Sequence, residues 1–385
     1  MGCARLALAT MIPFNKPYAA PRTWDYMREA IARAHISGDG AFTKRCQALL
    51  EGVLQVPKVL LTTSCTHALE LAALLLDIQP GDEVILPAFT FVSTANAFVL
   101  RGGRPVFADI RPDTLNLDES GLERLIGPRT RAIVAVHYAG VGCEMDAIRE
   151  LAALRSIVVV EDNAHGLFGT WAGKPLGTFG VLAALSFHET KNISCGEGGA
   201  LVVNDATLIE RAEILREKGT DRSRFFRGQV DKYTWVDVGS SYLPADLLAA
   251  FLLAQLEDRA SIQARRQRAW VHYRQHLSDW AEHQGVRLPH VPAHCVHPAH
   301  LFYLLMPDLT GRQALLAHLK GRQVNATFHY QPLHLSGMGQ RFGGKPGDCP
   351  VTESVSDRLV RLPLYVELDE SDQTRVVEAV RSFRG

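Results

Sequence analysis

The sequence predicts an α/β fold in which a large domain surrounds a mostly parallel sheet and a smaller α+β domain follows. Two observations lead to this prediction. Between residues 58 and 205, short apolar runs alternate with segments that carry apolar residues at helical spacing, as expected of parallel strands joined by helices. The chain also has 385 residues, which is more than one ordinary core accommodates, so a second domain is expected.

The strand-like runs of the large domain are short and almost continuously apolar. Val, Ile and Leu dominate them, which is typical of strands buried on both faces. We predict strands at residues 83–87, 105–110, 132–140, 157–162, 183–187 and 200–205, with helices at residues 66–77 and 145–155.

The C-terminal part of the chain carries a different pattern. A long helical stretch leaves the large domain, and two strands, a helix and a Gly/Pro-rich loop follow it. These elements are predicted at residues 243–277, 300–306, 323–334, 311–321 and 341–351, respectively. We therefore expect an N-terminal tail or arm at 1–20, the large domain at 21–255 and the small domain at 256–385.

The overall charge excludes some classes of function. The chain has 41 basic and 41 acidic residues, and this balance argues against proteins that bind nucleic acid or a membrane surface through a basic footprint. The seven cysteines are scattered without a CxxC pair. The sequence therefore predicts neither a disulfide framework nor a metal site, and it fits the reducing cytoplasm.

The N-terminal sequence "MGCARLALATM" does not have the features of a targeting signal. It is too short and too weakly apolar for a signal peptide or a membrane span. Position 6 is Leu, where the myristoylation pattern requires Ser or Thr. We expect a tail, or an upstream start with Met11 as the natural initiator.

Residues with chemically active side chains follow the predicted strands. Ligands bind outside the carboxyl ends of the strands in sheets of this kind. Phe91, Asp162, His165 and Lys191 all lie at such positions. An aromatic ring, a carboxylate, an imidazole and an amine are therefore expected to lie in one crevice.

This combination matches the requirements of pyridoxal phosphate (PLP). An amine forms a Schiff base with the cofactor, an acid keeps the ring nitrogen protonated, and a flat side chain covers the ring. The phosphate requires backbone N–H groups at the start of a helix, and Ser64, Cys65 and Thr66 precede a helical run. Each residue alone has a simpler interpretation, such as a helix cap, a core aromatic or a surface lysine. Their convergence, with the spacing from Asp162 to Lys191, favours the cofactor site.

Several motifs resemble one enzyme family. "EDNAH" (161–165), "SFHETKN" (186–192) and "GEGGAL" (196–201) are similar to motifs of the nucleotide-sugar aminotransferases, the DegT/DnrJ/StrS-like family of fold-type I PLP enzymes. The resemblance extends from residue 11 to residue 365. It implies a sheet of the seven-stranded type between helices, pyridoxal 5′-phosphate as the cofactor, and a homodimer with shared active sites.

The resemblance also implies roles for individual residues. Lys191 would carry the cofactor as a Schiff base, and Asp162 would pair with the pyridine nitrogen. His165 would lie near the phenolic oxygen, and Phe91 would cover the ring. The phosphate would be held by Cys65, Thr66 and Ser186, with Ser241 supplied by the neighbouring subunit. The nucleotide-sugar would be contacted by His329 and Tyr330.

Three segments are similar to one branch of the family, which makes dTDP-4-amino-4,6-dideoxygalactose. They span residues 74–103, 188–192 and 216–243. The similarity implies L-glutamate as the amino donor and dTDP-4-dehydro-6-deoxy-D-glucose as the acceptor. It also implies a place in the synthesis of a surface polysaccharide, such as the enterobacterial common antigen.

Other interpretations remain open at this point. The protein could aminate C3 or C4 of another nucleotide-linked keto-sugar, or it could be a non-catalytic sensor that retains the fold. A related branch performs dehydration with a histidine in place of the lysine, and Lys191 speaks against it. The glycines at 196, 198 and 199 suggest a dinucleotide-binding loop, but they lack GxGxxG spacing and precede a strand.

Overall fold

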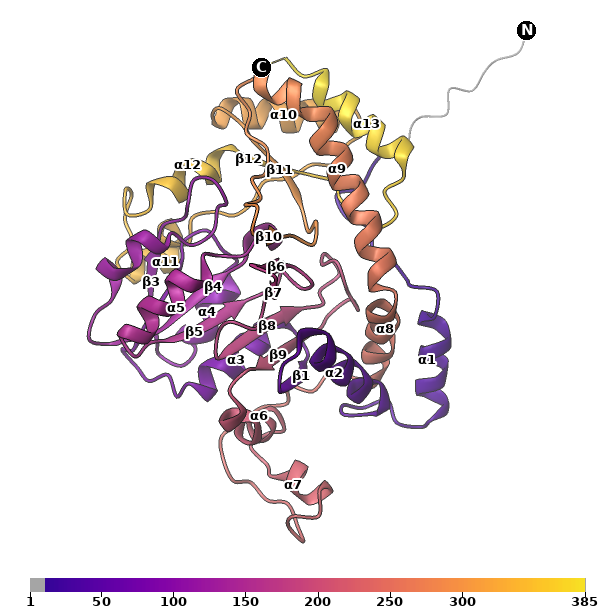
Figure 1. The fold of residues 1–385 in the computed structure, drawn as a ribbon, viewed down its shortest axis with the longest axis vertical. Helices are drawn as coiled ribbons and strands as arrows, with labels where there is room; N and C mark the ends of the chain where they lie inside the picture. Colours follow the sequence, from indigo (N-terminus) through magenta and orange to yellow (C-terminus); the bar gives the residue numbers. More distant parts are fainter. Residues whose placement is uncertain (1–10, 385) are drawn as a thin grey trace.

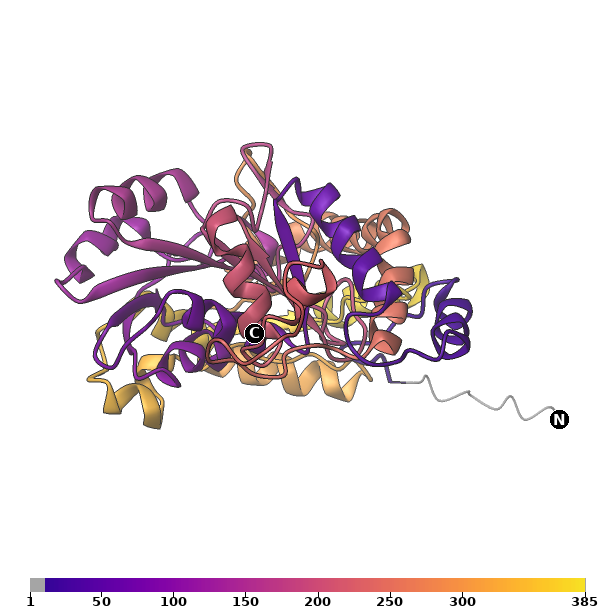
Figure 2. The ribbon, with the colours of Figure 1, turned by 90° about the horizontal axis from the view of Figure 1, so that it is seen from below.

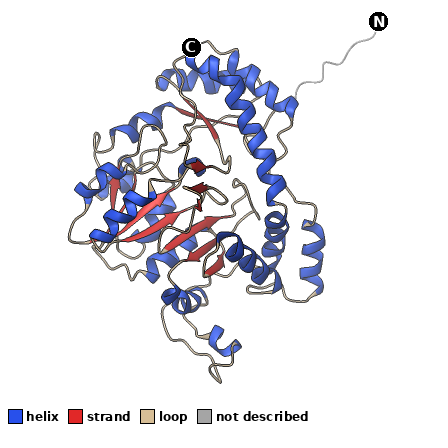
Figure 3. Ribbon diagram, viewed as in Figure 1, coloured by secondary structure: helices blue, strands red, loops and turns tan. Residues whose placement is uncertain are grey.

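The computed structural model describes residues 11–384, and its central feature is a seven-stranded sheet surrounded by helices (Figures 1 and 3). The strand order is β1-β9-β8-β5-β4-β2-β3. Every strand runs in one direction except β9, which is antiparallel to both neighbours. The strands are β1 (Lys58–Thr62), β2 (Glu83–Pro87), β3 (Arg104–Ala108), β4 (Thr130–Val136), β5 (Val158–Asp162), β8 (Leu182–Ser186) and β9 (Gly199–Val203). The predicted α/β fold with a mostly parallel sheet is confirmed.

Helices cover both faces of this sheet, as the view from below shows (Figure 2). One face packs against α3 (Cys65–Leu75), α4 (Val92–Val99) and α6 (Ile209–Arg216). The other face packs against α2 (Ala41–Leu54), α5 (Met145–Leu154) and α8 (Asp246–Glu257), and α1 (Thr23–Ala32) lies against α8. Because both faces are buried, the strands are apolar throughout.

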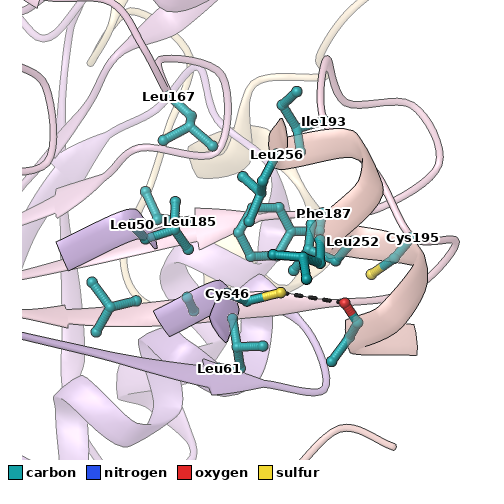
Figure 4. Packing of buried hydrophobic residues seen from close by; sticks show 14 of the residues in the cluster. Cys46, Leu50, Leu61, Leu167, Leu185, Phe187, Ile193, Cys195, Leu252 and Leu256 are labelled. Carbon is teal, nitrogen blue, oxygen red and sulfur yellow. Dashed lines mark hydrogen bonds between the residues drawn. The ribbon is translucent and has the colours of Figure 1, made fainter. Parts of the chain in front are cut away.

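The loop between β8 and β9 is held down by apolar packing (Figure 4). Phe187, Ile193 and Cys195 are buried in the core beneath the sheet. They lie among side chains of α2, α8 and the strands, including Leu50, Leu61, Leu185, Leu252 and Leu256. The Cys195 N–H also donates to the Phe187 carbonyl at 2.9 Å. This packing draws the intervening segment, with Lys191, into the fold.

The C-terminal part has a core of its own. α9 (Arg259–His283) leads to the two-stranded sheet of β11 (Phe302–Leu305) and β12 (Leu359–Leu362), beside α10 (Leu309–Gly321) and α13 (Glu370–Arg381). A separate cluster, which includes Phe89, Tyr138 and Tyr303, joins this part to the carboxyl ends of the main sheet. The division of the chain between residues 255 and 256 stays a prediction.

The remaining elements are short. β6 (Thr170–Trp171), β7 (Lys174–Pro175) and β10 (Cys295–Val296) form a small sheet. The 3-10 helices span Glu119–Leu125, Tyr138–Gly140, Ala206–Leu208 and Leu333–Leu335, and α7 (Arg222–Phe226), α11 (Gly337–Arg341) and α12 (Pro350–Arg358) complete the list. No helix within residues 11–384 combines the length and the apolar character needed to cross a bilayer.

Several predicted elements differ from the structure. The helical stretch at 243–277 is two helices, α8 and α9, which meet at Asp258. The predicted strand at 323–334 is wrong, because this segment makes only isolated bridges to Ile12 and Arg361. The predicted strand at 132–140 ends at Val136, since Ala139 and Gly140 adopt positive φ angles that turn the chain. Residues 1–10 of the predicted N-terminal tail lie outside the described residues, and Ile12 in the described half forms an isolated bridge with Val324.

Candidate active site

A cavity of about 420 Å³ lies at the carboxyl ends of the main strands, against β12. Its lining includes every predicted site residue but one: Cys65, Thr66, Phe91, Asp162, His165, Ser186, Lys191, His329 and Tyr330. Ser241 does not line the cavity of its own chain. It is exposed, and its backbone forms an isolated bridge with Glu217.

Lys191 projects into this cavity from the loop after β8. Its backbone N–H donates to the His188 carbonyl at 2.9 Å, but its Nζ makes no hydrogen bond or ion pair with the described part of the chain. Burial lowers the pKa of the amine from 10.5 to about 8, and the nearby Cys65 and Asp162 oppose this effect. The amine therefore has a substantial neutral fraction near physiological pH.

Asp162 ends β5 and faces the same cavity. Its neighbour Glu161 points to the opposite face, because successive side chains of a strand alternate. The Thr94 hydroxyl donates to Oδ2 of Asp162 at 2.7 Å, and the Ala164 N–H donates to Oδ1 at 3.2 Å. Burial raises the pKa of Asp162, while the Thr94 hydrogen bond and Lys191 act against the rise. The two hydrogen bonds fix the carboxylate in one orientation.

Glu161 ties this end of β5 to the neighbouring loop and to His137. Its carboxylate accepts hydrogen bonds from His137 Nε2 at 2.8 Å and from the backbone N–H groups of Gly177, Phe179 and Gly180 at 2.6–2.7 Å. Burial would raise the pKa of Glu161, but these donors outweigh it, and the pKa is lowered. Glu161 and His137 therefore anchor the strand end from behind and do not line the cavity.

The start of α3 lines one end of the cavity. Ser64 caps the helix, and its Oγ accepts the His67 N–H at 3.1 Å. The N–H groups of Cys65 and Thr66 have no acceptor in the described part of the chain, as expected of the first turn of a helix. A Cβ at Gly199 would lie 2.3 Å from the Ser64 carbonyl carbon. Only glycine therefore allows the start of β9 to lie this close to the start of α3.

Three histidines form one wall of the cavity. The rings of His165 and His300 stack at 4.2 Å between centroids, and His329 lies 6.1 Å from His165. His329 Nδ1 is hydrogen-bonded to the Tyr138 hydroxyl at 2.9 Å. Burial lowers the pKa of all three imidazoles, so they are neutral near physiological pH. Nδ1 of His165 is buried without a partner in the described chain and is free to bind a ligand.

Phe91 stands at the mouth of the cavity as the N-cap residue of α4. Its side chain is 56% exposed, and its ring centroid lies 6.4 Å from that of Tyr330. The ring is therefore free to cover a flat molecule that enters the cavity.

Sequence reasoning missed some cavity residues. His300 precedes β11, and Arg361 is in β12; both line the cavity. Neither His300 nor Arg361 follows a predicted strand of the main sheet. Thr94, in the first turn of α4, does not line the cavity but orients Asp162 from behind it. The buried polar position of Thr94 in an apolar helix is the one local signal that could have identified it.

The contents of the cavity fit PLP. A buried amine, a fixed carboxylate, an unpaired imidazole nitrogen, an exposed aromatic ring and backbone N–H groups at a helix start lie around one space. The amine would receive the aldehyde of PLP, and the carboxylate would receive its ring nitrogen. The imidazole would contact the phenolic oxygen, the aromatic ring would cover the ring face, and the N–H groups would bind the phosphate. Within residues 11–384, no group of three or more His, Cys, Asp or Glu side chains is arranged to hold a metal ion.

Known proteins share this fold and sequence pattern. The spore coat polysaccharide biosynthesis protein SpsC of Bacillus subtilis is 35% identical over 328 residues, which is 83% of this chain and 84% of SpsC. The aminotransferase TlmJ of Streptoalloteichus hindustanus superimposes with a TM-score of 0.89 at 32% identity, covering 97% of this chain and 98% of TlmJ. The PLP form of Spr1654 of Streptococcus pneumoniae, described as a sugar aminotransferase, superimposes with a TM-score of 0.88 at 25% identity, covering 97% and 98%.

The fold and the cavity define a PLP-dependent aminotransferase. The model of the DegT/DnrJ/EryC1/StrS aminotransferase family matches residues 20–381. The chain belongs to this family.

Because the Lys191 amine is buried, we expect its replacement by an apolar side chain to stabilise the protein. Lys191→Met should stabilise the cofactor-free protein at about pH 7 by on the order of 1–3 kcal/mol, because the folded protein pays to hold a buried ammonium there. The pKa of Lys191 is about 8 in the folded state and about 10.4 in the unfolded state. The unfolded chain binds more protons between these values, so wild-type stability rises with pH there.

Urea denaturation of both proteins at about pH 7 and about pH 10 measures this difference. The advantage of Lys191→Met should shrink at the higher pH. The exposed loop residue Lys345 supplies a control, and Lys345→Met should show no such trend. An advantage that is equal at both pH values would contradict the pKa shift.

Proposed function

We propose that the protein transfers the amino group of L-glutamate to C4 of dTDP-4-dehydro-6-deoxy-D-glucose. The product is dTDP-4-amino-4,6-dideoxy-D-galactose, for a surface polysaccharide such as the enterobacterial common antigen. The observation that carries the chemistry is the presence of the Lys191 amine and the Asp162 carboxylate in one cavity. When bound, PLP takes up the amino group and acts as an electron sink for the carbon that loses its proton.

Lys191 moves the protons in this proposal. Because its pKa is about 8, the neutral amine can accept the proton from Cα of the donor, and the ammonium can return a proton. In the first half-reaction, glutamate leaves as 2-oxoglutarate after hydrolysis. In the second, Lys191 delivers a proton to C4 of the sugar, and the face of delivery sets the configuration.

Asp162 and His165 would control the charge of the cofactor. The Asp162 carboxylate, fixed by Thr94, would keep the ring nitrogen protonated and stabilise the developing negative charge. His165 is neutral and has an unpaired Nδ1, so it would hydrogen-bond the phenolic oxygen. The helix start at Cys65 and Thr66, with Ser186, would bind the phosphate.

Sequence similarity supports the choice of sugar. The segments at 74–103, 188–192 and 216–243 resemble the branch that makes this amino sugar, and His329 and Tyr330 line the cavity where the nucleotide-sugar is expected. SpsC, a relative at 35% identity, is a polysaccharide biosynthesis protein. The same chemistry would serve C3 or C4 of another nucleotide-linked keto-sugar, and product analysis separates these cases.

The direct experiment is product identification. Purified protein with PLP, glutamate and the keto-sugar should form the 4-amino-4,6-dideoxygalactose derivative, identified by NMR.

Lys191→Ala should lose both the absorbance band of the lysine-bound cofactor and all transamination. Asp162→Asn should retain bound cofactor but lose turnover by about 10²-fold or more. Normal turnover by Lys191→Ala would refute the role of the lysine, and a different amino sugar would refute the substrate.

We further propose a homodimer with shared active sites. The arm around α7 projects away from the main sheet (Figure 1) and exposes several large apolar side chains. They are Phe225, Phe226, Tyr233, Trp235, Val236 and Val238, with Trp235 76% exposed. An apolar group of this kind suits a protein interface. Ser241 lies at the end of this arm, outside the cavity of its own chain, where a partner's cavity could receive it.

Mixed dimers test this arrangement. Ser241→Tyr should inactivate the protein, since the bulky ring would enter the partner's phosphate site. Co-expression of the Lys191→Ala and Ser241→Tyr chains should restore activity, because the mixed dimer contains one site without either defect. Absence of restoration, or a monomer by analytical ultracentrifugation at micromolar concentration, would contradict shared sites.

A further inference from the structure

Arg361 brings a cation into the cavity that the reaction steps above do not use. It lies in β12 opposite Tyr303 of β11, and its neighbours Val360 and Leu362 belong to the core beside that sheet. Successive side chains of a strand point to opposite faces, so Arg361 points away from this core. Its side chain lines the same cavity as Lys191.

Within residues 11–384, no carboxylate pairs with the Arg361 guanidinium. Its Nε donates to the Phe328 carbonyl at 3.3 Å, and its charge lies 4.8 Å from the ring centroid of Phe14. In the described part of the chain, neither Nη group makes a hydrogen bond or an ion pair. Burial lowers the pKa of this arginine. A partly buried cation without a counter-ion is costly, so this position is suited to an anionic ligand.

Few other side chains that line this cavity could bind an anion through a positive charge. Lys191 is occupied with the reacting groups in the proposed function, and burial keeps His165, His300 and His329 neutral. The proposed phosphate site is the start of α3, which offers backbone N–H groups rather than a charged side chain. Among the described lining residues, Arg361 is therefore a permanent positive charge that the proposed phosphate site does not use.

We propose that Arg361 binds the α-carboxylate of the amino donor, an inference that rests on the proposed function. The planar guanidinium can bind a carboxylate through two parallel N–H···O hydrogen bonds. In an amino acid, the carboxylate carbon is bonded to the carbon that loses its proton, so it must lie close to the Lys191 amine. Lys191 and Arg361 line one cavity, and the charge of Arg361 acts on the lysine.

The sugar substrate has a different charge distribution. The carbonyl at C4 is neutral, and the nearest phosphate is attached at C1 across the ring. A cation beside the reacting atoms therefore serves the first half-reaction, with the amino acid, more than the second half-reaction, with the keto-sugar.

Single-turnover kinetics of the two half-reactions test this assignment in the holoenzyme. For glutamate, Arg361→Gln should lower the second-order rate constant by about 10²-fold, because a charge-assisted bidentate contact is lost. Arg361→Lys should lose less, since it keeps the charge but not the fork. The reaction of the aminated enzyme with the keto-sugar should change far less. Arg381→Gln, on the exposed end of α13, is the matched control.

Two donor analogues identify the carboxylate. 4-Aminobutyrate lacks only the α-carboxylate of glutamate, and 2-aminobutyrate lacks only the side-chain carboxylate. Arg361→Gln should lose the preference for glutamate over 4-aminobutyrate and retain the preference over 2-aminobutyrate. The reverse pattern would overturn the proposal, because it would assign Arg361 to the side-chain carboxylate.

A loss concentrated in the second half-reaction would also overturn the proposal, in favour of a phosphate of the nucleotide-sugar. The first half-reaction requires no sugar, so a wrong sugar assignment would leave the donor measurements interpretable. Melting temperature and cofactor absorbance check that each variant folds, and Arg361→Lys supplies the comparison if Arg361→Gln does not.

Discussion

The position of the Lys191 amine depends on apolar packing on the other side of its loop. Phe187, Ile193 and Cys195 are buried among the side chains of α2 and α8, and this burial offsets the cost of placing an amine in a largely desolvated cavity. Burial of each large apolar side chain contributes roughly 1.5–3 kcal/mol to the free energy of folding, which is enough to offset that cost. The low pKa of Lys191, about 8, is a direct consequence of that placement.

The sheet places the second essential group. β5 and β8 are parallel neighbours, so their carboxyl ends meet at one edge, and Asp162 and the loop carrying Lys191 emerge there together. Glu161 and the backbone of residues 177–180 hold this edge from behind, while Thr94 orients the Asp162 carboxylate from α4. On β5, therefore, Glu161 on one face supports the strand end, and Asp162 on the other face lines the cavity.

The sequence was informative where chemistry follows the strands of the main sheet. Lys191, Asp162, His165 and Phe91 could be placed in one cavity because parallel strands end at the same edge. His300 and Arg361 could not, since their positions depend on how the C-terminal part packs against that edge, and no local pattern encodes this packing. The strand predicted at 323–334 failed for a related reason: its β-branched and aromatic residues contact the N-terminal segment and β12 only at single positions.

The most direct test of the central claim is a covalent one. Reduction of the PLP-loaded protein with borohydride, followed by proteolysis and mass spectrometry, identifies the lysine that holds the cofactor. The proposed mechanism predicts a phosphopyridoxyl group on the peptide that contains Lys191, at close to one per chain. A label on another lysine, or none in protein that still binds PLP, would contradict the assignment of the cavity as the catalytic site.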